Sequence, residues 1–433
     1  MNLETLRNKL ALDKLVETGV GLVSTKTYDE ISALILPMKR AEGDDPKMEL
    51  LEISFDGIRL IENPFIPDGE IWPFKPWDLG KAARTFWRMP TPFGMARILG
   101  PSYSLRCVVF HNISTTESPF TRNMGVSITP SALAAALQFL TRYYTPVRLQ
   151  DVLADCNGRR LPPRAILLTF DDGYASIMEW AAPLCGKFGV PAILFLNAAF
   201  LDNAALAPDN LVCYVANVLG METINAAARV IKGADMPKLK SLPQVFSCFF
   251  PSISLAERRV FLNALADVGG INERQMAREA GLYLTRKEVS ALAASGFEIG
   301  NHTYTHVHCR SLLPQNLSEE IDKNSAELEG LSGRKVRAFS LPYGSSADLT
   351  SDLARHLKLS GHDAVFLSES VANRRAGNTF QFDRVSTHAN SDAALFAEIE
   401  VLPRLRLIRN GLLGRCNQHP YQARNTCGKE QSS

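Results

Sequence analysis

The 433-residue sequence lacks three features that would place it in a specialised class. No apolar run reaches the roughly 20 residues that span a bilayer; the longest lies at 190–201. Lys and Arg total 47 against 45 Asp and Glu, so no cationic surplus indicates nucleic acid as a partner. The eight cysteines form no C-x-x-C pair. We therefore expect a globular chain with reduced thiols that binds no nucleic acid.

The N-terminal segment also lacks the pattern of a secretory signal. Residues 1–19 carry acidic residues early and have neither an unbroken apolar core nor an A-x-A cleavage site. This predicts a cytoplasmic protein. Two stretches with Arg among large apolar residues, 80–100 and 402–415, are compatible with contact to a membrane surface. Surface helices that cover their own core have the same composition, and we favour that interpretation.

The length predicts more than one structural unit. Residues 1–100 are mixed in pattern, and we assign them to an N-terminal α+β region of unknown role. From 101 to 400, short apolar or β-branched runs alternate with helical patterns, which is typical of an α/β fold with parallel strands. Residues 401–433 are expected to form a basic helix and a polar tail.

Seven strands are expected in the 101–400 region. They lie at RCVVF (106–110), AILLTF (165–170), PAILFL (191–196), FEIG (297–300), VRAFSL (336–341), DAVFL (363–367) and FDRVST (382–387). Residues 201–283 show no strand pattern and have a helical one. They predict an insertion of roughly 80 residues in one strand-to-helix connection, of the kind that builds lids or substrate walls.

Polar residues follow several of these strands, where a parallel barrel or sheet would gather them on one rim. Asp171 and Asp172 follow the strand at 165–170, and His302 and His306 follow the one at 297–300. The histidines, at i and i+4, would lie on one face of a helical turn and reach one metal ion. One carboxylate can complete the ligand set while the other acts as a base toward water.

Each pattern alone has an ordinary structural explanation. Asp-Asp-Gly is more often a turn, and unligated histidine pairs are common in folded proteins. Their joint occurrence directly behind two strands favours a metal site.

Three motifs resemble those of the polysaccharide deacetylase family, the NodB-homology proteins of carbohydrate esterase family 4. They are LTFDDG (168–173), NHTYTH (301–306) and FSLPYG (339–344). The resemblance covers about residues 104–400, interrupted by the insertion. It implies a distorted (β/α) barrel of about seven strands.

The resemblance also implies a role for each matching residue. Asp171 would be the general base, and Asp172, His302 and His306 would bind a divalent metal, usually zinc. The backbone N–H of Tyr343 would stabilise the tetrahedral oxyanion. The implied reaction is metal-dependent hydrolysis of N-acetyl groups on amino sugars of a polysaccharide or glycan precursor.

This chain departs from the family pattern at the residue that orients the general base. Many members have an Arg in the third motif that orients the base, whereas this chain has Ser340. Arg384 is the predicted substitute, and a surface cation on a strand is the alternative.

The general acid is a late histidine in the family, and this chain offers several. His388 is the prediction because it follows its strand on the rim. His356 lies in a helical stretch, and His362 precedes its strand and should lie at the opposite end. His111 and His308 are weaker candidates, which we expect to line a groove or face solvent.

Two other functions stay open at this point. A deformylase or amidase acting on a smaller lipid-linked or soluble amide would need a closed pocket, which the insertion can supply. A catalytically silent barrel that binds glycan is disfavoured, since such proteins usually lose the base or a ligand and all four positions are intact here.

Overall fold

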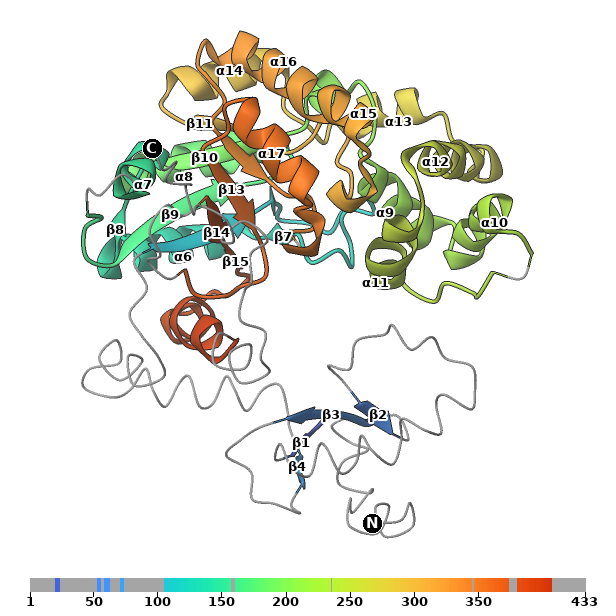
Figure 1. The fold of residues 1–433 in the computed structure, drawn as a ribbon, viewed down its shortest axis with the longest axis horizontal. Coiled ribbons are helices and arrows are strands. Elements are labelled where there is room, and N and C mark those ends of the chain that lie inside the picture. Colours follow the sequence, from blue (N-terminus) through green and yellow to red (C-terminus); the bar gives the residue numbers. More distant parts are fainter. Residues whose placement is uncertain are drawn as a thin grey trace, which may run out of the picture. The chain divides into compact units, whose positions relative to one another are not determined.

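The computed structural model describes residues 105–406, except 157–159, 235, 345 and 374–379, together with four short strands nearer the N-terminus (Figure 1). The chain divides into two compact units, Met1–Arg88 and Met89–Ser433. In the part of the chain that is described, no helix is both long and apolar enough to cross a membrane. The predicted membrane-compatible stretch 80–100 and the tail 416–433 lie outside the described residues, and the stretch 402–415 is described only to residue 406.

The first unit contains one small sheet. Its strands run in the order β2-β3-β1-β4, with β1 and β3 parallel and the outer pairs antiparallel. Their bounds are Val20–Val23 for β1, Ile53–Phe55 for β2, Ile58–Glu62 for β3 and Ile71–Pro73 for β4.

A barrel of parallel strands forms the centre of the second unit (Figure 1). The strand order is β14-β13-β12-β11-β10-β9-β5-β15, and every neighbouring pair is parallel. The bounds are Leu105–Phe110 (β5), Ala165–Phe170 (β9), Ala192–Leu196 (β10), Glu298–Asn301 (β11), Ala338–Ser340 (β12), Ala364–Leu367 (β13), Gln381–Asp383 (β14) and Val385–Ser386 (β15). Each predicted strand is present, with its ends displaced by at most two residues.

The strand predicted at 382–387 is in fact two short strands separated by Arg384. β14 pairs with β13, whereas β15 pairs with β5. Because β13 and β5 lie at opposite ends of the strand order, this interrupted strand closes the sheet into a barrel with seven strand positions. The expected distorted (β/α) barrel is confirmed.

The inside of the barrel is filled by side chains from alternate strand positions. Phe195 of β10 contacts Phe366 of β13, with ring centroids 5.3 Å apart, although two strand positions separate them in the sheet. Cys107 of β5 and Leu167 of β9 belong to the same buried cluster. A packed interior places the polar chemistry beyond the strand ends, as in other parallel barrels.

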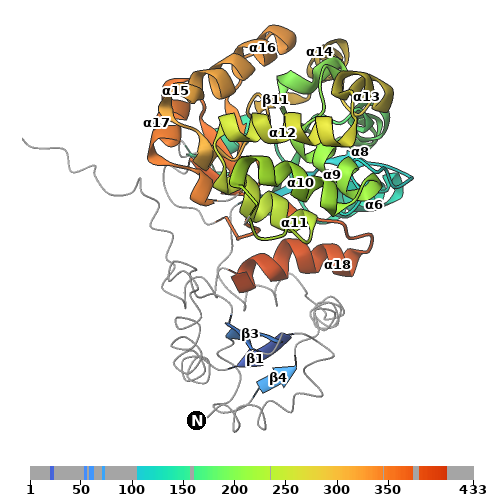
Figure 2. The same ribbon diagram turned by 90° about the vertical axis from the view of Figure 1, so that its right-hand side faces the viewer.

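Helices surround the barrel on the outside (Figures 1 and 2). They are α6 (Pro130–Tyr143), α7 (Leu149–Cys156), α8 (Ala182–Phe188), α14 (Arg286–Ala294), α15 (Pro314–Leu317), α16 (Lys323–Ser332), α17 (Ser351–Leu359) and α18 (Asp392–Phe396). α14 begins at a capping box in which Thr285 and Glu288 bond each other's backbone N–H groups.

The predicted helical insertion lies between β10 and α14 and groups to one side of the barrel, at the right in Figure 1. Its helices are α9 (Pro208–Val218), α10 (Met221–Lys232), α11 (Leu242–Gln244), α12 (Leu255–Gly269) and α13 (Glu273–Ala280). They share a hydrophobic core that includes Val212, Ile224, Phe249, Phe261 and Leu265. The insertion is therefore a packed helical body rather than a loop.

A substitution in β11 tests the tight packing of the barrel interior. A Cβ atom added at Gly300 would lie 2.5 Å from Cε1 of Phe195. We expect Gly300→Ala to lower the free energy of unfolding by about 1–3 kcal/mol, as overpacked core positions do. Urea denaturation measures this change.

Gly330 in α16 provides the matched control, because a Cβ there meets no atom within 4 Å. Gly330→Ala should be neutral or stabilising by up to about 1 kcal/mol. Equal stabilities of the two variants would contradict the proposed packing constraint.

Candidate functional site

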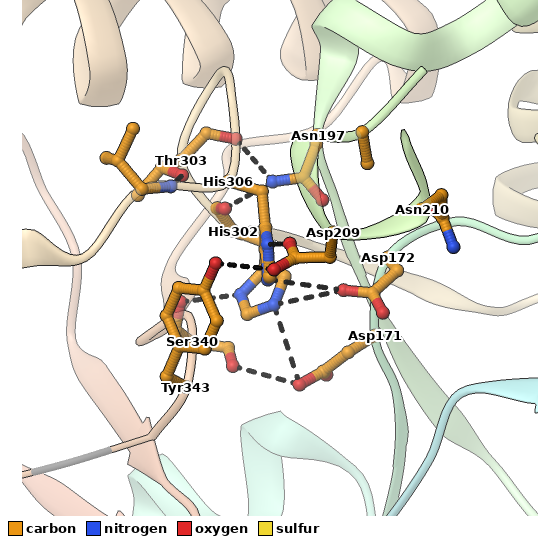
Figure 3. Close-up of polar contacts among 12 residues, drawn as sticks. Asp171, Asp172, Asn197, Asp209, Asn210, His302, Thr303, His306, Ser340 and Tyr343 are labelled. Carbon is orange, nitrogen blue, oxygen red and sulfur yellow. Dashed lines mark hydrogen bonds and ion pairs between the residues drawn. The ribbon is translucent and has the colours of Figure 1, made fainter. Parts of the chain in front are cut away.

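The residues that follow the barrel strands meet in a cavity of about 190 Å³ (Figure 3). Asp171 and Asp172 enter it from the loop after β9, His302 and His306 from the loop after β11, and Tyr343 from the loop after β12. Together with Arg384, which also lines this cavity, the structure therefore brings six of the seven predicted site residues to one cavity, from four separate segments of the chain.

Asp172, His302 and His306 have the geometry of a metal-ligand set. Nε2 of His302 and Nε2 of His306 lie 3.4 and 3.5 Å from the same oxygen, Oδ1 of Asp172. Ligands about 2.1 Å from a tetrahedral zinc ion lie roughly 3.4 Å from one another. Two imidazoles and one carboxylate leave a fourth position open, so the residues present fit a divalent metal such as zinc.

Both imidazoles are oriented through the ring nitrogen that faces away from Asp172. Nδ1 of His302 lies 2.8 Å from the backbone carbonyl oxygen of Ser340. Nδ1 of His306 lies 2.5 Å from Oδ2 of Asp209. Each acceptor favours the tautomer that carries its proton on Nδ1, which leaves Nε2 as a metal ligand.

The two histidines lie in an irregular loop and not on the helical turn that their spacing predicted. Thr303 and His306 have left-handed backbone conformations, with φ of 63° and 52°. The Asn197 side chain, at the end of β10, donates hydrogen bonds to the carbonyl oxygens of His302 and Thr303. The i, i+4 spacing found the correct pair, but tertiary contacts rather than helix geometry bring the rings together.

Asp171 is held by Arg384 through a bidentate ion pair. Nη1 and Nη2 of Arg384 each lie 2.7 Å from one carboxylate oxygen of Asp171, and both side chains are buried. Nη2 also donates to Oγ of Ser340 at 2.8 Å. Burial raises the pKa of Asp171, but the charges of Arg384 and His302 outweigh it, so the pKa lies below its usual value. Asp171 is therefore ionised at neutral pH.

Tyr343 also has a left-handed backbone, with φ of 62°. Its ring stacks on His308 with centroids 3.6 Å apart, and its hydroxyl donates to Oδ1 of Asp209 at 2.6 Å. The backbone N–H of Tyr343 donates no hydrogen bond to another described residue. It remains available to a ligand in the cavity.

The structure does not bring His388 to this site. The chain leaves the barrel after β15 ends at Ser386, and His388 is exposed and does not line the cavity. His111, directly after β5, does line it together with both aspartates. Burial is the largest influence on His111 and lowers its pKa. Its position directly after a strand was the sequence signal, whereas the family resemblance favoured a later histidine as the acid.

Asp209, Asn210 and Phe246 of the helical insertion also line the cavity. Burial raises the pKa of Asp209, but His306 and the Tyr343 hydroxyl keep it below its ordinary value. Sequence reasoning missed Asp209, because an acidic residue in the first turn of a helix is common for its favourable interaction with the helix dipole alone.

The pairing of Asp171 with Arg384 generates a stability prediction. Arg384→Met leaves a buried carboxylate without its partner, and we expect the free energy of unfolding to fall by about 3–5 kcal/mol. Adding Asp171→Asn should recover much of this loss, because the uncompensated charge is gone. Denaturant titration of the single and double variants measures the coupling.

Arg355→Met on the surface of α17 is the matched control. Arg355 pairs with Asp352, and both side chains are more than half exposed. Its loss should cost less than about 1 kcal/mol. A double variant no more stable than Arg384→Met alone would argue against the charge-pair explanation.

Comparison with known proteins agrees with the motifs. Residues 245–362 match the family model described as polysaccharide deacetylase. This segment contains the second and third motifs, whereas Asp171 and Asp172 precede it in sequence and join it only in space. A 63-residue segment is 36% identical to the uncharacterized protein YlxY of Bacillus subtilis (strain 168). That segment covers 14% of this chain and 20% of YlxY.

Similar solved structures include three proteins, two of which are described as a deacetylase or a de-N-acetylase. Streptococcus pyogenes deacetylase PplD, in complex with acetate, is 13% identical with a TM-score of 0.46, over 68% of this chain and 98% of that chain. IcaB from Ammonifex degensii is 18% identical with a TM-score of 0.44, over 69% and 98%. A de-N-acetylase from Aggregatibacter actinomycetemcomitans is 15% identical with a TM-score of 0.41, over 65% and 93%.

The family model agrees with the second and third motifs, which lie within the matched segment, and the first motif, at 168–173, lies outside it. The resemblance to the polysaccharide deacetylase family that was seen in the sequence is thereby confirmed over residues 245–362.

Proposed function

We propose that the protein is a metal-dependent hydrolase that removes N-acetyl groups from amino sugars of a polysaccharide or glycan precursor. The observation that carries this proposal is the convergence of Asp172, His302 and His306 beside the separate, ionised carboxylate of Asp171. A ligand set with an adjacent base is the composition that amide hydrolysis by an activated water requires.

Each protein group near the cavity has one task in the proposed reaction. A divalent metal bound by Asp172, His302 and His306 would lower the pKa of a water molecule and polarise the amide carbonyl. Asp171 accepts the water proton, and Arg384 keeps this carboxylate oriented and ionised. The backbone N–H of Tyr343 donates a hydrogen bond to the developing oxyanion.

His111 is our candidate for the group that protonates the departing amine. It lines the cavity beside both aspartates, whereas the originally predicted His388 is exposed. Because burial lowers its pKa, His111 is neutral at pH 7 before the reaction. It can therefore relay to the amine nitrogen the proton that Asp171 accepts from water.

The insertion favours a compact substrate over an unrestricted polymer groove. Asp209, Asn210 and Phe246 line the cavity together with residues from the barrel loops such as His111 and Ser368. This wall supports a second candidate function, hydrolysis of a formyl or other small amide on a soluble or lipid-linked molecule. Terminal sugars of a glycan would also fit such a site.

An activity assay tests the proposal and separates the two substrate classes. The metal-loaded protein should release acetate from an N-acetylglucosamine oligomer, and a chelator should abolish the release. Formate release from a formamido sugar, without acetate release, would favour the small-amide function. No turnover of either substrate by protein that contains stoichiometric metal would contradict the proposed hydrolase.

Two aspartate variants separate the base from the ligand. Asp171→Asn should retain metal and lose turnover by about 10²–10⁴-fold, the usual contribution of a general base. Asp172→Ala should lose metal, because it removes one of three protein ligands. Metal content and acetate release measure these effects, and near-normal activity of Asp171→Asn would exclude it as the base.

Two histidine variants decide which group is the acid. We expect His111→Ala to lower kcat by about 10²–10⁴-fold, and His388→Ala to leave it within about twofold, since an exposed side chain away from the cavity contributes little. Acetate release at saturating substrate measures both. The opposite result would restore the original prediction of His388.

A further inference from the structure

The helical insertion reaches the candidate metal ligands through one buried carboxylate. Asp209 lies in the first turn of α9, and its side chain is 6% exposed. Its two oxygens have different partners: Oδ2 lies 2.5 Å from Nδ1 of His306, and Oδ1 accepts a hydrogen bond from the Tyr343 hydroxyl at 2.6 Å (Figure 3). One side chain of the insertion thus contacts two segments of the barrel rim.

The two histidines differ in what orients them. His302 is held by a neutral acceptor of the barrel itself, the carbonyl oxygen of Ser340. His306 is held by a carboxylate supplied from outside the barrel. A carboxylate on the distal nitrogen fixes the ring and makes the other nitrogen a stronger metal donor. The insertion therefore has a means of acting on one ligand selectively.

A second insertion residue supports the same loop at its backbone. Arg258 of α12 donates hydrogen bonds from Nη2 to the carbonyl oxygens of Thr305 and His306, at 2.7 and 2.9 Å. His306 needs this support because its φ of 52° is uncommon for a residue other than glycine. The insertion thus contacts His306 at the ring and at the backbone.

We propose that Asp209 is a positioning residue for His306 and that the helical insertion, through this contact, sets the metal affinity of the site. The inference rests on the metal site assigned under the proposed function. The insertion then has a role in assembling the metal site in addition to forming a wall of the cavity.

Zinc affinity, measured by competition with a chromophoric chelator, tests the proposal without reference to turnover. Replacing such a supporting group typically weakens metal binding by 10–100-fold. We expect Asp209→Asn, which keeps an acceptor oxygen but loses the charge, to weaken zinc binding by about tenfold. Asp209→Ala, which loses both, should approach about 100-fold.

Two controls isolate the contact with His306. Asp267→Asn removes an exposed carboxylate of α12 in the same insertion and should leave zinc affinity unchanged. Tyr343→Phe removes the hydroxyl on the other oxygen of Asp209 and should change zinc affinity by less than about threefold, since the bond to His306 remains.

The outcomes distinguish this inference from the proposed function. Wild-type protein that binds no zinc would refute the metal site itself. Wild-type zinc affinity retained by folded Asp209→Asn and Asp209→Ala would leave the metal site intact and overturn the role of Asp209. A Tyr343→Phe loss equal to that of Asp209→Ala would overturn the assignment to His306.

A measurement on the wild-type protein covers the case in which the variants fail to fold. In zinc-loaded protein labelled with ¹⁵N-histidine, long-range ¹H–¹⁵N NMR distinguishes a metal-bound ring nitrogen from a protonated one. We expect His306 to bind zinc through Nε2 and to carry its proton on Nδ1. Zinc bound at Nδ1 of His306 would exclude the contact with Asp209 and overturn the proposal.

Discussion

The ion pair between Arg384 and Asp171 joins the closure of the barrel to its chemistry. Arg384 occupies the break between β14 and β15, where the last strand changes partner from β13 to β5. Its side chain is 1% exposed, so its charge needs a buried partner, and Asp171 supplies both oxygens. The closure of the barrel between β14 and β15 and the orientation of the candidate base therefore depend on the same contact.

Much of the fold could be predicted because parallel strands buried on both faces give short apolar runs. β9 and β10 are buried along their whole length, and their sequences were recognisable from that alone. The break at Arg384 was not predictable in this way. A single buried cation looks like an interruption in any strand pattern, and its partner lies 213 residues earlier in the chain.

Part of the candidate site could likewise be predicted from the strands, and part of it could not. Asp171, Asp172 and His302 follow strands directly, so strand topology was enough to bring them together. His388 also follows a strand, but β15 has only two residues, and the chain turns to solvent before reaching it. Asp209 belongs to a helix that no strand positions. Its contact with His306 depends on how the insertion packs, which local sequence does not encode.

The left-handed backbone at three site residues has a consequence for how this domain can change. Asp172, His306 and Tyr343 have φ of 70°, 52° and 62°, a conformation that costs side chains of this kind about 1–3 kcal/mol each. Glycine at any of these positions would relieve the strain but remove a group that faces the cavity. At these three positions, a substitution that raises thermal stability would therefore also remove a side chain of the site. A related protein that no longer used this site could therefore gain stability by glycine substitution at these positions.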